Sequence, residues 1–243
     1  MIWAIGDLHL DHTGQKPMDI FGGNWANHEE RIFTFWKENI KEEDTVLIVG
    51  DISWALRLED SVPDLERIHH MPGTKLLIKG NHDYWWSSLA KLNNLDLHSL
   101  HYIFNTGRVI NGVGYCGTRG WSDIDSNSFD EQDEKIYKRE MDRLNRSIDA
   151  MEELGKENPI HTRIAMIHYP PFSSKGEPND FAKILSERGI DLCIYGHLHA
   201  YGHKYIVEGE FDGVRYQCVS SDYIDFQPVK LEIGGEDGEG IRD

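Results

Sequence analysis

The sequence reads Ile2-Trp3-Ala4-Ile5-Gly6-Asp7-Leu8-His9 near its start, an apolar run followed at once by a glycine and by two residues that can bind a metal ion. The run is continuous rather than alternating, which predicts a strand buried on both faces. Four similar runs follow along the chain, at Val46–Val49, Leu76–Ile78, Ile164–Ile167 and Leu192–Tyr195. We therefore expect strands that are covered on both sides.

Residues with metal-binding side chains directly follow every one of these runs. After the four later runs the sequence reads Gly50-Asp51, Gly80-Asn81-His82-Asp83 (through Lys79), His168, and Gly196-His197-Leu198-His199. Ligands of an α/β sheet bind at the carboxyl ends of its strands. Side chains after five neighbouring strands should therefore converge on one place, although Asp7 and His199 lie far apart in the sequence. The glycines allow the tight turns that bring backbone close to such a site.

The segments between the runs predict the remaining elements. Apolar residues recur three and four positions apart in three helix candidates, Asn27–Ile40, Phe129–Leu154 and Asp180–Arg188. Two hairpin turns are expected at Asn111-Gly112 and Asp212-Gly213. This order predicts an α/β sandwich in which a central sheet faces a second sheet, with helices outside. We expect one domain over residues 1–233 and a flexible, acidic and Gly-rich tail over residues 234–243.

The composition is that of an ordinary globular protein, with 39% hydrophobic and 28% charged residues among 243. The formal net charge of −17 argues against binding to long nucleic acids or to acidic membranes, because both need a basic surface. The three cysteines are widely spaced, which favours reduced thiols in an intracellular protein. We recognise neither a secretory signal nor a membrane-spanning run, so we expect a cytoplasmic location and no membrane partner.

The types of the clustered residues favour a site for two metal ions. Imidazole and carboxylate groups suit zinc, iron, manganese, nickel or cobalt, and the lack of clustered cysteines argues against a structural zinc site. Two Asp, four His and one Asn are too many ligands for one ion and suit two. Two ions roughly 3.5–4 Å apart can activate a bridging water and hold a phosphoryl group for in-line attack. Each motif alone could be an ordinary turn, but all of them after buried strands favour the metal site.

The combined pattern resembles that of the calcineurin-like metallophosphoesterase superfamily, from Gly6 to His199. The resemblance implies a four-layer αββα sandwich, with two mixed β-sheets flanked by helices, and a dinuclear metal centre. Position by position it implies a first metal held by Asp7, His9 and His199, a second held by Asn81, His168 and His197, and a bridging Asp51. It also implies that His82 contacts the substrate and protonates the leaving oxygen or stabilises its charge, and that Asp83 orients His82 and favours its charged form.

Two departures from better-known branches narrow the resemblance. Purple acid phosphatases carry a tyrosine ligand three residues after the bridging Asp, where this chain has Trp54, so a tyrosinate-bound ferric centre is not expected. Protein Ser/Thr phosphatases read Gly-Asn-His-Glu and have an arginine next to the bridging-Asp motif. Here the sequence reads Gly-Asn-His-Asp, and Ile52-Ser53-Trp54 follows Asp51, which disfavours protein phosphatase activity. The chain resembles uncharacterised bacterial phosphohydrolases, which leaves the natural substrate open.

Three residues beside the motifs are candidates for substrate binding. Arg119 could clamp a phosphate oxygen in a bidentate contact. Trp85 or Trp86 could stack on a base or an aromatic leaving group. The alternative is that both tryptophans pack in the core or at its rim and that Arg119 makes a structural salt bridge.

Our main hypothesis is a phosphohydrolase that depends on two divalent ions and cleaves phosphate mono- or diesters of small molecules by attack of a metal-bridging hydroxide. The first alternative is a nucleotide or nucleic-acid phosphodiesterase or nuclease. The second is a scaffold with the same fold and no catalysis, against which the complete ligand set and His82 argue.

Overall fold

The structure, a computed structural model, describes residues 1–233 and contains two β-sheets. The first has the strand order β11-β1-β2-β3-β4, formed by Val229–Lys230, Ile2–Ile5, Thr45–Val49, Thr74–Ile78 and Leu100–Tyr102. The second has the order β5-β6-β7-β8-β10-β9, formed by Arg108–Ile110, Val113–Thr118, Thr162–Ile167, Leu192–Tyr195, Val214–Cys218 and Gly209–Phe211. The predicted tail at 234–243 lies outside the described residues.

Both sheets are mixed. In the first sheet β1 to β4 are parallel and β11 pairs antiparallel with β1. In the second, β6, β7, β8 and β10 are parallel, and β5 and β9 add antiparallel edges through the two predicted hairpins. Parallel strands end at the same edge of a sheet, so the loops that follow them lie close together.

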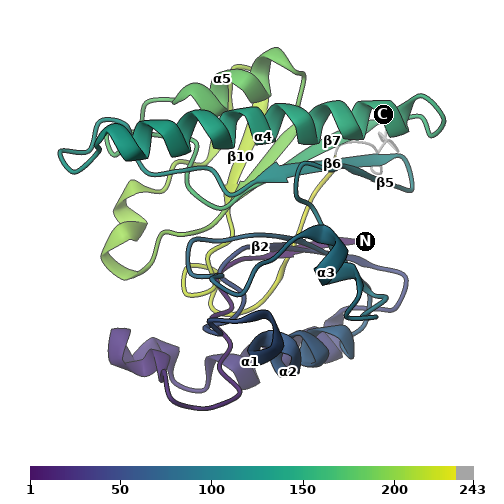
Figure 1. Cartoon of the computed structure of the whole chain (residues 1–243), viewed down its shortest axis with the longest axis vertical. Coiled ribbons are helices and arrows are strands. Elements are labelled where there is room, and N and C mark those ends of the chain that lie inside the picture. The colour runs from purple at the N-terminus through teal and green to yellow at the C-terminus, as the bar shows by residue number, and fades with distance from the viewer. Residues whose placement is uncertain (234–243) are drawn as a thin grey trace, which may run out of the picture.

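Helices cover the outer face of each sheet (Figure 1). On the first sheet these are α1 (His28–Asn39), α2 (Leu58–His69) and α3 (Leu89–Asn93), and on the second they are α4 (Glu131–Gly155) and α5 (Asp180–Glu187). Three 3₁₀ helices lie in the loops, η1 (Met18–Phe21), η2 (Gly23–Trp25) and η3 (Ala200–Tyr205). The helices bury apolar stripes against the sheets, as amphipathic helices of a globular protein do.

One apolar cluster, the first-sheet cluster, lies between the first sheet and its helices, and another, the second-sheet cluster, lies between the second sheet and its helices. A third apolar cluster fills the space between the two sheets. It joins residues such as Leu47 and Leu76 of the first sheet to Ile164 and Ile194 of the second, and all four are fully buried. The layers are therefore helix, sheet, sheet and helix, the αββα sandwich that the sequence predicted. Over residues 1–233, no helix has both the length and the apolarity needed to cross a membrane.

The structure differs from the predicted elements in the following ways, and it adds α3, β4 and β11, which were not predicted. The five strands that precede the candidate ligands are not neighbours in one sheet, because β1, β2 and β3 belong to the first sheet and β7 and β8 to the second. Helix α4 starts two residues later than predicted, because Asp130 accepts N–H bonds as its N-cap. Helix α2 was not predicted, since Pro63 inside it is atypical of a helix.

Candidate metal centre

The first group of candidate ligands contains Asp7 and His9, which follow β1, and His199, which follows β8. One ligand atom from each lies within 4.8 Å of the others. The Nε2 atom of His199 is 3.3 Å from Oδ1 of Asp7. Asp7 and His9 are almost completely buried, and His199 is partly exposed. These three side chains are the ones that the resemblance assigned to the first metal.

The second group contains Asp51 after β2, His168 after β7 and His197 after β8, with the same 4.8 Å limit between their ligand atoms. The Nε2 atom of His168 lies 3.4 Å from Oδ2 of Asp51. It also lies 2.8 Å from the side-chain oxygen of Asn81, which follows β3. The structure thus brings the amide of Asn81 to this group, where the resemblance assigned it.

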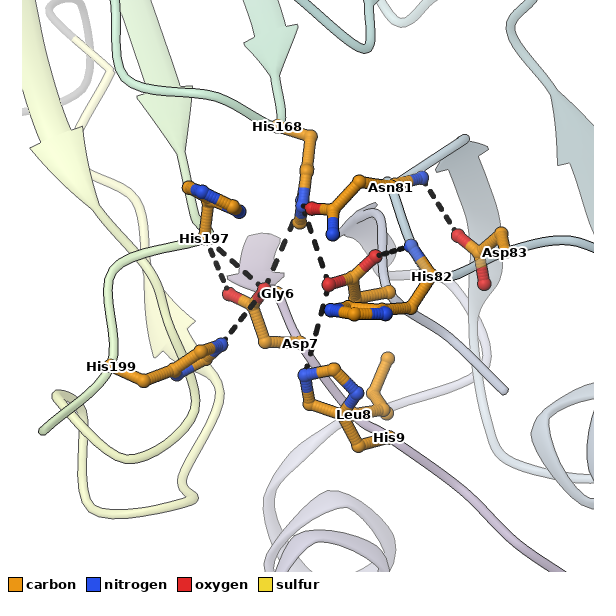
Figure 2. A network of polar contacts seen from close by, with 12 residues as sticks. Gly6, Asp7, Leu8, His9, Asn81, His82, Asp83, His168, His197 and His199 are labelled. Atoms are coloured by element: carbon orange, nitrogen blue, oxygen red, sulfur yellow. Dashed lines mark hydrogen bonds and ion pairs between the residues drawn. The ribbon is translucent and has the colours of Figure 1, made fainter. Parts of the chain in front are cut away.

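Asp51 lies between the two groups. Its Oδ2 atom is 3.8 Å from Nε2 of His9 in the first group and 3.4 Å from Nε2 of His168 in the second. Its other carboxylate oxygen, Oδ1, accepts the backbone N–H of His82 at 2.8 Å. One oxygen therefore faces both groups while the other holds the carboxylate in place. Figure 2 shows how the labelled imidazoles of both groups gather around Asp7.

Hydrogen bonds at Nδ1 orient two of the imidazoles. Nδ1 of His168 donates to the backbone oxygen of Val49 at 2.9 Å, and Nδ1 of His199 donates to Oδ1 of Asp222 at 2.8 Å. Both partners can only accept, so Nδ1 carries a proton in each ring. This leaves Nε2 as the atom directed into the site, as is usual for histidines that bind metals.

The charges of these groups depend on their neighbours. Burial raises the pKa of Asp7, but His199 and His168 outweigh burial and lower it below its usual value. Burial lowers the pKa of His168 and His199, but adjoining carboxylates raise them to about 9 and about 10. Burial lowers the pKa of His9 to about 4. A metal ion would replace the protons on Nε2 of the two charged histidines.

Close backbone packing explains why glycines precede the ligands. Gly50 has a φ of +80° and faces Gly80, and a Cβ added to it would lie 2.7 Å from Cα of Gly80 and 2.8 Å from Nδ1 of His168. Such distances are far below ordinary contact, so a side chain at Gly50 would displace the ligand loops. The loops after β2, β3 and β7 can therefore approach one another only because glycine stands at this position.

The donor set fits divalent metal ions. Carboxylate, imidazole and amide groups converge in two overlapping groups, a combination that suits first-row transition metals. The buried Nε2 atom of His199 lies 3.3 Å from Asp7 but makes no well-directed hydrogen bond within residues 1–233, as expected of a nitrogen directed at a metal. These observations agree with metal ligation.

Comparison with known proteins identifies the family. A sequence model described as calcineurin-like phosphoesterase matches residues 1–201. The chain belongs to the calcineurin-like phosphoesterase family. This membership indicates metal-dependent hydrolysis of phosphoesters. All of the candidate ligands, from Asp7 to His199, lie within the matched residues, and Asp222 lies outside them.

Two curated relatives of this calcineurin-like phosphoesterase are phage proteins. The gene 66 protein of Mycobacterium phage D29 is 29% identical over 113 residues, which are 44% of this chain and 54% of that protein. The gene 66 protein of Mycobacterium phage L5 is 32% identical over 81 residues, 33% of this chain and 39% of that protein. The chain thus spans about half or less of the length of these relatives. A crystal structure of a protein of unknown function from Aquifex aeolicus matches 94% of each chain with a TM-score of 0.46 and 18% identity.

In this calcineurin-like phosphoesterase, His82 lies beside the two ligand groups, and its ring packs 4.6 Å from the ring of Trp54 and 5.8 Å from that of His9. Trp54 also stacks on His9 at 4.9 Å, so one indole supports a candidate ligand and the candidate acid. At the position where purple acid phosphatases have a tyrosine ligand, this chain has Trp54, whose ring packs against His9 and His82.

Asp83 has a different role from the predicted one. Its carboxylate accepts the backbone N–H groups of Ile52, Ser53 and Gly80 and the indole N–H of Trp85, at 2.7–3.3 Å. It is fully buried, and burial followed by the charge of Asp51 raises its pKa to about 6. Asp83 therefore ties the β2 loop to the β3 loop rather than orienting the His82 ring.

The two tryptophans predicted to stack on substrate lie in the core. Trp85 and Trp86 are 2% and 8% exposed and pack with the first-sheet cluster, so neither ring is open for stacking, although part of Trp86 lines a cavity. The exposed ring next to His82 is that of Tyr84, 60% exposed and 6.3 Å away. We therefore correct the stacking assignment. Its failure has a simple cause, because the loop turns inward directly after Tyr84.

Arg119 makes a structural salt bridge and also keeps a donor with which it could bind a phosphate. Its Nη2 atom lies 3.3 Å from the buried carboxylate of Glu140, and its guanidinium packs on the ring of Trp121. The structural salt bridge is thus present. The Nε–H group of Arg119 has no partner within residues 1–233, which leaves a donor for a further ligand.

Asp222 is a site residue that the sequence reasoning missed. It accepts from Nδ1 of His199 and from the backbone of Ala200, and His203 lies 3.2 Å from its second oxygen. The signal was available, because Asp222 follows β10 as the other site residues follow their strands. The sequence predicts β10 only as an arm of a hairpin, whereas in the structure it also pairs in parallel with β8.

Proposed function

We propose that the chain is a dinuclear-metal phosphoesterase acting on small phosphate mono- or diesters. The observation that carries the proposal is the position of Asp51, whose Oδ2 atom faces His9 of one ligand group and His168 of the other. A carboxylate shared in this way is what two ions a short distance apart require. The family membership supports phosphoester hydrolysis as the reaction.

In such a reaction, different side chains would hold the metal ions, orient the ligating histidines and donate a proton to the leaving group. Two bound ions would activate a water for attack on phosphorus and offset the charge of the phosphoryl oxygens. Asp51 and Asp7 hold this positive charge in a buried site, and His168 and His199 are kept in their ligating orientation by Val49 and Asp222. An imidazole nitrogen of His82 would donate a proton or hydrogen bond to the leaving oxygen.

The decisive experiment combines metal analysis with a substrate panel. The purified protein is loaded with Mn²⁺, Fe²⁺, Zn²⁺ or Ni²⁺ in turn and assayed with p-nitrophenyl phosphate, bis-p-nitrophenyl phosphate and nucleotides. We expect two ions per chain and hydrolysis that a chelator abolishes. The ratio of the two nitrophenyl rates separates monoesterase from diesterase preference. Two bound ions without hydrolysis of any substrate would instead favour the scaffold hypothesis.

A histidine variant tests the role of His82. His82→Ala should lower kcat by about a hundred-fold or more, as expected for loss of a general acid, while the metal content stays at two ions. His98→Ala is the matched control, since the His98 side chain is 78% exposed and pairs with Asp96 away from the centre. Unchanged hydrolysis by metal-loaded His82→Ala would rule out the proposed acid.

A further inference from the structure

Four cationic side chains gather beside the metal loops, although the chain as a whole is strongly acidic. They come from the end of β3, the end of β6 and the part of α4 around the buried Glu140. Together with two hydroxyl side chains they line a cavity of about 360 Å³: Lys79, Arg119, Arg139, Arg143, Ser87 and Ser88. We refer to these residues as the basic cleft.

The charge of the basic cleft is not balanced by its neighbours. Glu140, 1% exposed, is shared by all three guanidinium groups, at 2.7 Å from Arg143, 3.3 Å from Arg119 and 3.5 Å from Arg139. Its other oxygen accepts the hydroxyl of Thr118 at 2.8 Å. Three of the four cations of the cleft therefore share one carboxylate. A chain with a net charge of −17 therefore concentrates excess positive charge in one place.

Asp83 is the other carboxylate that acts on the charge of Lys79. It already accepts three backbone N–H groups and the indole N–H of Trp85, so its oxygens are occupied within the metal loops. Its negative charge still offsets one of the cations, so four cations against Glu140 and Asp83 leave two positive charges at the cleft.

The cleft also holds donors that lack an acceptor. The Nε atom of Arg119 and the Nε1 atom of Trp86 are both buried and have no hydrogen-bond partner within residues 1–233. Both side chains line the same cavity. A buried donor without a partner costs about 1–3 kcal/mol, so such groups usually mark a place where a ligand or water accepts. Cations, free N–H donors and hydroxyls together suit a phosphate group.

The cleft adjoins the metal centre. Lys79 directly precedes Gly80 and the candidate ligand Asn81 in the loop after β3. The backbone oxygen of Arg119 accepts the N–H of Tyr169 at 2.9 Å, and the Tyr169 ring lies 4.1 Å from that of His197. The loops that bring ligands to the metal centre thus also bring cations to the cleft.

We propose that the basic cleft binds a second phosphate group of the substrate, one that is not hydrolysed, while the first lies at the metal centre. This inference rests on the proposed function. It narrows the substrate class to small phosphoesters that carry a further phosphate.

The test compares two ligands that differ by one phosphate, adenosine 5′-monophosphate and adenosine 3′,5′-bisphosphate. The first measurement is the shift in Tm of the full-length protein with each nucleotide, which requires no hydrolysis. The second is inhibition of p-nitrophenyl phosphate hydrolysis by the metal-loaded enzyme. We expect the bisphosphate to inhibit about ten-fold more strongly, as one additional charge-assisted contact allows, and to give the larger Tm shift.

Arg143→Gln should abolish this difference between the nucleotides. Arg139→Gln should reduce it in a chain whose fold is at little risk, since Arg139 is 52% exposed and two arginines stay on Glu140. Lys138→Gln is the matched control, because Lys138 lies on the same helix, is 68% exposed and pairs with Glu134 rather than with Glu140. It should leave the difference as in the wild type.

Two results would overturn the inference. The nucleotides could inhibit and stabilise equally, or the difference could survive Arg143→Gln and Arg139→Gln. Inorganic phosphate serves as a third ligand. If it stabilises the protein through the two arginines while the bisphosphate gains nothing over the monophosphate, the cleft takes free phosphate and the substrate assignment is wrong. Failure of hydrolysis alone would count against the proposed function, because the Tm comparison would still report binding in the cleft.

Discussion

Four candidate ligands have a left-handed backbone conformation, with positive φ, that residues other than glycine rarely adopt. Asp7, His9, Asp51 and His197 have φ values of 58°, 46°, 50° and 73°. Left-handed conformations of this kind cost about 1–3 kcal/mol each and persist only where the surrounding structure imposes them. The tight turns after β1, β2 and β8 impose them here, because each turn must direct a side chain back across the ends of the strands.

Gly50→Ala should therefore remove the metal centre. The new Cβ would meet Gly80 and His168, both in ligand loops, so we expect loss of bound metal and of at least about 2 kcal/mol of stability. Gly14→Ala is a matched control, because Gly14 also has a positive φ, of 65°, but has open space around it. That variant should lose only about 1 kcal/mol and keep its metal. Metal content and urea unfolding of the two variants decide the matter, and a metal-replete Gly50→Ala protein would contradict the packing argument.

At the residue scale, the sequence predicted which side chains gather but not all of their contacts. The candidate ligands were recognisable because residues with metal-binding side chains follow buried strands, and the ends of those strands converge. The contacts of Asp83 and the burial of Trp86 depend on which way the β3 loop turns, and neighbouring residues in a turn face different directions. Asp222 was missed because its contact with His199 depends on the parallel pairing of β10 with β8, which a hairpin signal does not reveal.

At the scale of elements, α4 depends on its N-terminal cap. The Asp130 side chain accepts the backbone N–H groups of Gln132 and Asp133, and the Asp133 side chain accepts the backbone N–H of Asp130. Asp130→Ala should destabilise the protein by about 1 kcal/mol, as measured by thermal or urea unfolding. Asp142→Ala, which removes an exposed carboxylate from the middle of the same helix, should change stability by less than about 0.5 kcal/mol. Equal effects of the two changes would mean that the cap contributes nothing specific.

The elements themselves were predictable to different degrees. Strands such as β2 are predictable because they are short apolar runs, and α5 is predictable from its apolar stripe before Gly189. Helix α2 has a proline at position 63 and no side-chain N-cap, so local signals underestimate it. Its helical state depends on burying Leu65 and Ile68 against the first sheet, a tertiary contact that the local pattern does not contain.

At the scale of the whole molecule, the cluster between the sheets joins the two halves. Leu47 in the first sheet is fully buried in this cluster, so Leu47→Ala should cost about 2–5 kcal/mol. Leu154→Ala on α4 is the control, since Leu154 is 43% exposed and should contribute much less. If the halves form one domain, the cost of Leu47→Ala appears in the unfolding of both.

Two probes weight the halves differently. Trp121 packs with the second-sheet cluster, whereas Trp25, Trp36, Trp85 and Trp86 lie in the first-sheet cluster. Fluorescence therefore reports chiefly on the first half, whereas helical circular dichroism reports on both halves, since α1 and α2 have 12 residues each and α4 has 25. We expect the two urea transitions to coincide in the wild type and to shift together in Leu47→Ala. Separate transitions would divide residues 1–233 into two folding units.

The site joins the first strand of the chain to segments that are synthesised late. Gly6 donates its N–H to Val219 at 2.7 Å, Ser221 donates its hydroxyl to Gly6, and Asp222 orients His199. On the ribosome, β1 emerges long before these partners exist. A nascent chain therefore lacks part of the candidate metal centre, and the complete set of side chains would be available to an ion only after translation has passed Asp222. Which metal is acquired then depends on the pool that the finished chain meets, because donors of this kind bind several divalent ions.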